Sequence, residues 1–240
     1  MRVFKILFIF ITSSAGLFLV SCQSEDLKPN QIDAGKAYYP VQIGKFWVYK
    51  VDTITYKFDG SIQKGTYFRK ERISDSLYRQ EGALVYRLEI SKSLSENGPW
   101  NSSSIWNLRQ DNDKIIKTEE NIPYVKVRFP LKNGAIWDGN VFNILQDSAR
   151  IFPFTVQNLG VSQTFKQEEI ASVQVLQKVD SNCVNKSAFF ELYLFNIGLA
   201  YMRNSFIEYS QDGDDPCSKP IPKIEQGYDN IFTLVSHGSE

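Results

Sequence analysis

Histidine and cysteine, on which most nucleophilic and metal chemistry depends, are scarce in this chain of 240 residues. There is one histidine, His237, three residues before the C-terminus, and there are three cysteines. A catalytic triad or Cys-His pair needs a histidine held in the fold, and we expect the C-terminal tail to fray. Zinc sites need clustered Cys and His, and no glycine-rich phosphate-binding motif is present. We therefore expect no cofactor and no enzymatic activity.

An excess of one charge is also lacking. The 27 Lys and Arg residues are balanced by 27 Asp and Glu residues, and no basic stripe is present. Nucleic-acid binding is therefore not expected. After residue 22 no apolar run is long enough to span a bilayer.

The N-terminus contains the one apolar run of note, residues 6–20, which follows Arg2 and Lys5. It is short for a transmembrane helix and predicts a secretory signal peptide. Residues 19–22, Leu-Val-Ser-Cys, resemble the lipobox of bacterial lipoproteins. The resemblance implies cleavage after residue 21 and attachment of diacylglycerol and palmitate to Cys22, which would anchor the chain to the outer membrane. The alternative is an ordinary signal peptide that happens to precede a cysteine.

Residues 22–37 are predicted to be a flexible acidic tether, because their polar composition cannot form a core. The pair Glu25-Asp26, close behind Cys22, resembles the export tag of Bacteroidota-type lipoproteins. That resemblance implies display on the cell surface, which we slightly prefer to the periplasmic face.

Two cysteines remain, Cys183 and Cys217, both in polar segments typical of turns. In an oxidising compartment an even remainder predicts a disulfide. A catalytic thiol is less favoured because it would need a histidine partner.

Period-two alternation of apolar and polar residues dominates the chain from residue 38 onwards, for example in residues 47–52, 84–90 and 124–129. This pattern predicts strands with one buried and one solvated face, so we expect Lys126 to face water. Asp-Gly and Asn-Gly turns separate the strands. Residues 38–240 are therefore predicted to be one antiparallel, all-β domain with at most one or two short helices. Residues 170–179 fit either a helix or a strand, and their β-branched content favours a strand.

A short motif, Pro-x3-Gly-x2-Trp, occurs twice, ending at Trp47 and at Trp137. We interpret each copy as a glycine turn that places a tryptophan in the core. The alternative is a pair of tryptophan platforms for a sugar ring.

The segment Tyr38-Tyr39-Pro40-x3-Gly44-x2-Trp47-x-Tyr49, together with residues 197–201, resembles a diffuse group of Bacteroidota-type outer-membrane lipoproteins. The group is similar to the half-barrel folds of the periplasmic lipoprotein carrier and its outer-membrane receptor. The resemblance implies a strongly curved antiparallel sheet with an apolar concave face. A β-sandwich and a closed lipocalin-like barrel are the alternatives. Fold alone does not determine function.

The candidate sites are weaker signals. Asp212, Asp214 and Asp215 form an acidic turn that could hold calcium, although it lacks the ligand spacing of an EF-hand. Ser76 and Ser148 lie in triplets that resemble the O-glycosylation sequon of the same bacterial group.

Aromatic residues are abundant, with 17 Phe, 12 Tyr and 4 Trp. We expect Tyr124, Phe189 and Tyr193 to lie on outward strand faces and to form a binding surface. The adjacent carboxylates of Glu119-Glu120 and of Glu168-Glu169 are interpreted as solvated charges.

These observations predict a membrane-anchored lipoprotein that acts as a non-catalytic binding or accessory module, with a lipid, a glycan or a protein as ligand. A periplasmic assembly factor is the alternative, and a hydrolase that uses carboxylates is the least favoured.

Overall fold

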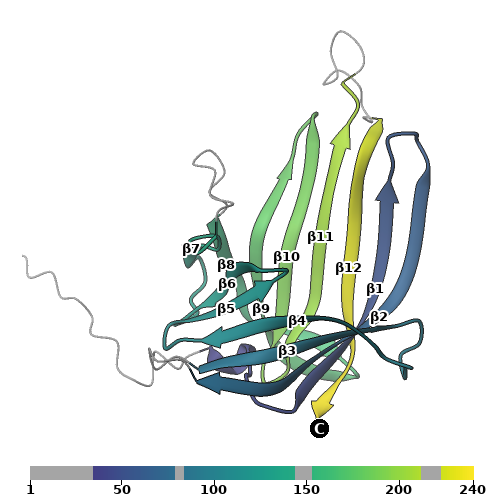
Figure 1. Cartoon of the computed structure of the whole chain (residues 1–240). Coiled ribbons are helices and arrows are strands. Elements are labelled where there is room, and N and C mark those ends of the chain that lie inside the picture. The colour runs from purple at the N-terminus through teal and green to yellow at the C-terminus, as the bar shows by residue number, and fades with distance from the viewer. Residues whose placement is uncertain (1–34, 79–83, 144–152, 212–222) are drawn as a thin grey trace, which may run out of the picture.

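Twelve antiparallel strands form one continuous sheet in the computed structural model, which describes residues 35–78, 84–143, 153–211 and 223–240 (Figure 1). A 3₁₀ helix, η1 (Lys36–Tyr38), precedes the sheet. The first six strands are β1 (Lys45–Tyr56), β2 (Ile62–Tyr78), β3 (Leu84–Ser93), β4 (Asn101–Gln110), β5 (Lys114–Glu119) and β6 (Ile122–Arg128). The remaining six are β7 (Ile136–Asp138), β8 (Pro153–Phe165), β9 (Glu168–Ser181), β10 (Asn185–Leu194), β11 (Gly198–Tyr209) and β12 (Ile224–Ser239).

The strand order is β6-β5-β4-β3-β2-β1-β12-β11-β10-β9-β8-β7. Every pairing joins strands that are neighbours along the chain, except the pairing of β1 with β12. The two halves of the chain are thus two meanders joined by their first and last strands. No helix in the described ranges is long and apolar enough to cross a membrane.

The sheet curves until its two edge strands meet. Val125 N on β6 donates a hydrogen bond to Gly139 O just after β7, at 2.9 Å. The indole Nε1 of Trp137 on β7 donates to Val125 O at 2.8 Å. The prediction of an all-β, strongly curved antiparallel sheet is confirmed, and the sheet is nearly closed into a barrel rather than being a half-barrel.

Strand alternation agrees with the sequence in β1. Trp47, Tyr49 and Val51 are 6%, 2% and 0% exposed, whereas the side chains of Lys50 and Asp52 are 46% and 44% exposed. The segment 170–179 lies within β9, so the preference for a strand there is confirmed.

The C-terminal segment does not fray, and that expectation is wrong. His237 lies within β12 and is paired with Trp47 of β1. The backbone N of Glu240 donates to Gly44 O at 3.0 Å, which holds the last residue against the start of β1. The imidazole of His237 lies beside the ring of Phe165, with 5.9 Å between the ring centroids.

Both copies of the repeated motif place a tryptophan in the core, as predicted. Gly44 and Gly134 have φ angles of 87° and 78°, which turn the chain into the strand that carries the tryptophan. Trp47 and Trp137 are both buried, so neither is an accessible platform for a sugar ring.

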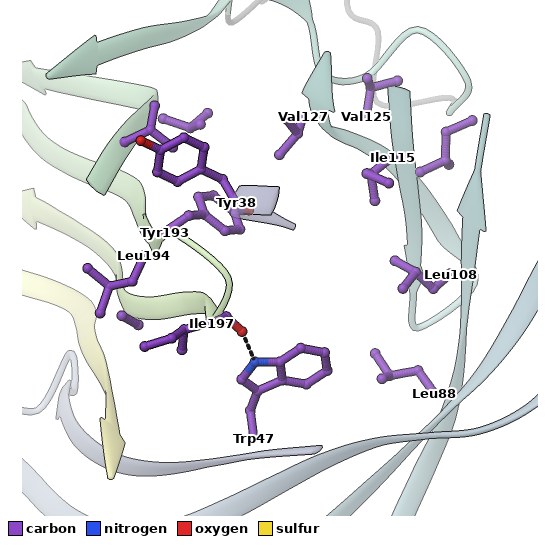
Figure 2. Packing of buried hydrophobic residues seen from close by; sticks show 14 of the residues in the cluster. Tyr38, Trp47, Leu88, Leu108, Ile115, Val125, Val127, Tyr193, Leu194 and Ile197 are labelled. Atoms are coloured by element: carbon purple, nitrogen blue, oxygen red, sulfur yellow. Dashed lines mark hydrogen bonds between the residues drawn. The ribbon is translucent and has the colours of Figure 1, made fainter. Parts of the chain in front are cut away.

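Trp47 connects segments that are far apart in the sequence. Its Nε1 donates to Ile197 O at 2.6 Å, and Tyr38 and Tyr193 belong to the same cluster of buried residues (Figure 2). A Cβ at Gly198 would lie 3.0 Å from Nε1 of Trp47, a tight contact, and the φ of 107° at this position also favours glycine. Residues 38–49 and 197–201, which carry the resemblance stated from the sequence, therefore meet in space.

We expect Trp137→Phe to destabilise the protein by about 2 kcal/mol, because it removes the hydrogen bond to β6 and part of the buried ring. Urea unfolding followed by circular dichroism measures the change. Trp100→Phe, in the segment between β3 and β4, is the matched control and should cost less than about 1 kcal/mol. Equal losses in the two variants would show that the contact between β6 and β7 contributes little.

Candidate ligand-binding cavity

Six charged side chains form a continuous chain inside the curved sheet. They alternate in sign and come from four strands, β2, β5, β6 and β10. We call them the charge chain: Arg69, Glu71, Lys117, Glu119, Lys126 and Glu191.

The first contacts of the charge chain join β2 to β5. Nη2 of Arg69 lies 2.5 Å from Oε1 of Glu71, and Nζ of Lys117 lies 3.0 Å from Oε2 of Glu71. The same ammonium lies 3.6 Å from Oε1 of Glu119. Since β3 and β4 separate β2 from β5 in the sheet, these contacts cross its interior.

The remaining contacts join β5 and β6 to β10. Nζ of Lys126 lies 3.4 Å from Oε1 of Glu119 and also forms an ion pair with Oε1 of Glu191. The hydroxyl of Tyr193 donates to Oε2 of Glu191 at 2.5 Å. The charge chain thus connects strands near both ends of the sheet.

Mutual compensation holds Glu71, Glu119 and Lys126 in their charged forms. Burial raises the pKa of the Glu119 carboxyl, but the ammonium of Lys126, then Lys117 and Arg69, outweigh burial and lower that pKa to about 2. Burial likewise raises the pKa of Glu71, and Arg69 and Lys117 bring it below its usual value. Burial lowers the pKa of Lys126, yet Glu119 and Glu191 raise it well above the ordinary range.

Aromatic rings pack against the cations. The guanidinium of Arg69 lies 4.3 Å from the ring centroid of Trp106 and 5.5 Å from that of Phe232. The ammonium of Lys117 lies 4.8 Å from the ring centroid of Trp106. Cation–π contacts of this kind stabilise charges that have lost water.

A cavity of about 590 Å³, partly open to solvent, lies on the concave face of the sheet beside the charge chain. Arg69, Glu119, Lys126 and Glu191 form its charged part. Its apolar walls come from β6, β8, β10, β11 and β12 and consist of Tyr124, Phe154, Phe189, Met202, Phe206, Tyr228 and Phe232.

Strand register explains why these side chains share one wall. Phe189 of β10 is paired with Asn204 of β11, and Met202 of β11 is paired with Phe232 of β12. Phe206 of β11 is likewise paired with Tyr228 of β12. Cross-strand partners point to the same face of a sheet, so the rings form neighbouring rows.

The aromatic residues singled out from the sequence have two different positions. Tyr124 and Phe189 line the cavity. Tyr193 is 1% exposed and lies in the core, where its ring is 5.5 Å from that of Tyr39. The expectation that these three side chains face outward is therefore wrong, because the curvature of the sheet turns this face inward.

Two expectations about charge are also wrong. Lys126 is 6% exposed instead of facing water, and Glu119 is part of the charge chain rather than a solvated carboxylate. Period-two alternation correctly put Lys126 and Val127 on opposite faces, but both faces of β6 are covered. Glu168 and Glu169 are exposed, as expected.

The other predicted sites depend mostly on residues outside the described ranges: Cys22, Ser148, Asp212, Asp214, Asp215 and Cys217. The lipid anchor, the calcium turn and the pairing of Cys183 with Cys217 stay predictions. Ser76 lies in β2 opposite Tyr86 of β3, and its glycosylation stays a prediction too. Within the described residues no three His, Cys, Asp or Glu side chains are placed to hold a metal ion.

Sequence reasoning missed the charge chain and most of the cavity wall. One signal was available on β6, where Lys126 stands between the buried Val125 and Val127. Such charges read as solvent-facing unless the sheet is known to close over them.

Comparison with known proteins adds little. No protein family and no curated protein matches the chain. Among solved structures, a proposed outer membrane lipoprotein-sorting protein domain from Vibrio parahaemolyticus is weakly similar, with 8% sequence identity over 85% of this chain and 88% of that chain and a TM-score of 0.20. A similarity of this size supports no conclusion, and the lipoprotein group named from the sequence is not confirmed by it.

We expect Lys126→Met to lower the free energy of unfolding by about 3–5 kcal/mol, because it leaves the buried carboxylate of Glu191 without its cation and leaves Glu119 with Lys117 alone. Urea unfolding measures the loss. Adding Glu191→Gln to this variant should restore part of the stability by removing the unpaired charge.

Lys50→Met is the control for this experiment, because Lys50 pairs with Asp52 on the exposed face of β1. It should cost less than about 1 kcal/mol. If Lys126→Met were no worse than Lys50→Met, the charge chain would not be a structural element of the barrel.

Proposed function

We propose that this protein is a membrane-anchored lipoprotein whose β domain binds a small amphipathic ligand in the concave cavity and does no chemistry on it. The observation that carries the proposal is the cavity itself, in which one part of the wall is aromatic and the other is charged. Its volume of about 590 Å³ falls within the range of roughly 300–1,000 Å³ typical of small-molecule sites.

The shape of the cavity supports a ligand more than a flat protein interface. Phe189, Phe206 and Phe232 come from three adjacent strands of a curved sheet, so their rings surround a volume. Apolar area of a ligand that is buried against these rings favours association. The charged part of the wall remains suited to water and to the polar end of the ligand.

The carboxylates at the cavity do not suit acid–base catalysis. Glu119 and Glu191 come from facing strands, which is the arrangement that a glycoside hydrolase would need. However, Lys126 contacts both, and the pKa of Glu119 is about 2. A general acid must be protonated near neutral pH, so Glu119 cannot supply that proton. This favours a binding role over a hydrolase.

The membrane anchor is proposed on the sequence of residues 19–22 and on the polar tether behind it. The predicted tether of residues 22–37 has to end before η1, because Ala37 O accepts a hydrogen bond from Asn196 N. The part ahead of η1 would let the domain stand clear of the outer membrane. The acidic pair Glu25-Asp26 supports display on the cell surface.

The binding function predicts that the full chain, held in phosphatidylcholine nanodiscs, enhances the fluorescence of the neutral dye N-phenyl-1-naphthylamine above a blank of protein-free discs. Met202→Trp should weaken the dye at least about tenfold, because a larger side chain fills the cavity. Ile62→Trp adds the same ring at an exposed position of β2 and should leave dye binding unchanged. Equal dye binding by Met202→Trp and the unaltered protein would exclude the cavity as the site.

The anchor predicts that Cys22→Ser accumulates as an uncleaved precursor that incorporates no radiolabelled palmitate. Protease treatment of intact cells should remove the domain of the unaltered protein. Palmitate labelling of the Cys22→Ser variant would refute the lipid anchor, and full protection from protease would refute surface display.

A further inference from the structure

Three buried polar atoms of residues that line the cavity have no hydrogen-bond partner among the described residues. They are Nε of Arg69, Nε2 of Gln177 and Oδ1 of Asn204. Buried polar atoms are nearly always paired in folded proteins, so an unpaired group at a cavity is a sign of what the cavity receives. Two of these atoms donate hydrogen bonds and one accepts.

These polar atoms lie among the aromatic rings rather than apart from them. Asn204 of β11 is the register partner of Phe189 on β10, and Phe189 is in turn paired with Lys178, the residue after Gln177. The guanidinium of Arg69 lies against the ring of Phe232. A ligand that packs on these rings therefore lies beside residues that carry unpaired polar groups.

Most of the charged side chains around the cavity are already paired within the protein. The charge chain contains three cations and three carboxylates, which cancel. Arg203, which also lines the cavity, forms a two-point pair with Asp229 at 2.9 and 2.8 Å. An anion would meet Arg69, Lys126 and Arg203 already paired with carboxylates, and a cation would meet carboxylates already paired with Lys126. Either would lose its water without gaining a counter-ion.

A plain hydrocarbon chain does not fit either, because it would leave the three polar atoms buried and unpaired. Hydroxyl groups do fit. Each hydroxyl both donates and accepts, so it can pair with Arg69 and Gln177 as an acceptor and with Asn204 as a donor. A sugar ring adds apolar C–H faces that can pack on aromatic rings.

We propose that the cavity binds an uncharged glycosyl group, with its hydroxyls on Arg69, Gln177 and Asn204 and its C–H faces on the phenylalanine rings. This inference rests on the proposed ligand-binding function and specifies the chemistry of the ligand. The glycosyl group can belong to a glycan or to a glycolipid, and the probes below distinguish the two.

Eight-carbon amphiphiles with different head groups test the charge preference. The neutral probes are octyl β-glucoside, octyl β-galactoside and octyl α-mannoside, and the charged ones are octanoate and octyltrimethylammonium. Calorimetry below micelle-forming concentrations, on the full chain in nanodiscs with protein-free discs subtracted, gives each affinity. At least one glycoside should bind about tenfold more tightly than both ions. An ion that binds as tightly as the best glycoside, or failure of all three glycosides to bind, overturns the proposal.

Single substitutions test the named hydrogen bonds. Gln177→Leu and Asn204→Leu should each weaken the best glycoside about fivefold to tenfold and leave N-phenyl-1-naphthylamine binding intact. Gln174→Leu is the matched control, since Gln174 lies on the same strand and pairs with exposed Asn158. Unchanged glycoside affinity in both test variants overturns the assignment. If the unaltered protein binds the dye but none of the three glycosides, only the glycosyl inference is refuted. If it binds neither the dye nor the glycosides, the cavity is refuted as a binding site.

Maltotriose, which has no alkyl chain, identifies the source of the glycosyl group. Binding of maltotriose within about tenfold of the best glycoside assigns the site to a glycan. Binding of the glycosides alone assigns it to a glycolipid whose chain packs on the phenylalanine wall.

Discussion

Ion pairs between strands that are not neighbours in the sheet organise the interior of this protein. The contact between Lys117 and Glu71 joins β5 to β2, and the contact between Lys126 and Glu191 joins β6 to β10. A buried charge without a partner is very unfavourable, so each of these side chains requires its partner to be in place. The Lys126–Glu191 pair therefore joins two distant strands and also forms part of the cavity wall.

The closure and the cavity are consequences of one geometry. Two meanders join through β1 and β12, and their outer strands approach until Val125 and Trp137 exchange hydrogen bonds with the opposite edge. Tyr38, Trp47 and Tyr193 fill one part of the enclosed space (Figure 2). Where the aromatic wall of β10 to β12 faces the charge chain, the space is not filled, and a cavity remains.

The chemistry of the cavity follows from compensation. Because Glu119 and Glu71 are held ionised by their cations, neither carboxyl can serve as an acid near neutral pH. Because Arg69, Lys126 and Arg203 are already paired with carboxylates, these cations offer a charged ligand little net attraction. What is left for recognition is the set of unpaired amide and guanidinium atoms beside the phenylalanine rings.

Much of the fold was predictable from patterns that act over a few residues. These are the alternation in residues 47–52, the glycine turns before Trp47 and Trp137, and the Asp-Gly and Asn-Gly turns between strands. Lys126 and Glu119 were not predictable in the same way. Alternation correctly separates their faces from those of Val127 and Thr118, but a period-two pattern cannot say whether the polar face meets water or a second layer. The position of Tyr193 was missed for the same reason.

By itself the sequence determined that the chain forms antiparallel strands and that Trp47 and Trp137 lie in the core. It also gave the expectation of a lipid at Cys22. These depend on side-chain type and short spacing, which act locally along the chain. Only the tertiary structure decided that Arg69, Lys126 and Glu191 line one cavity, and that Phe189, Phe206 and Phe232 enclose a volume. Lys126 and Glu191, for example, are 191 − 126 = 65 positions apart in the chain, and they form an ion pair only because the sheet curves far enough to close.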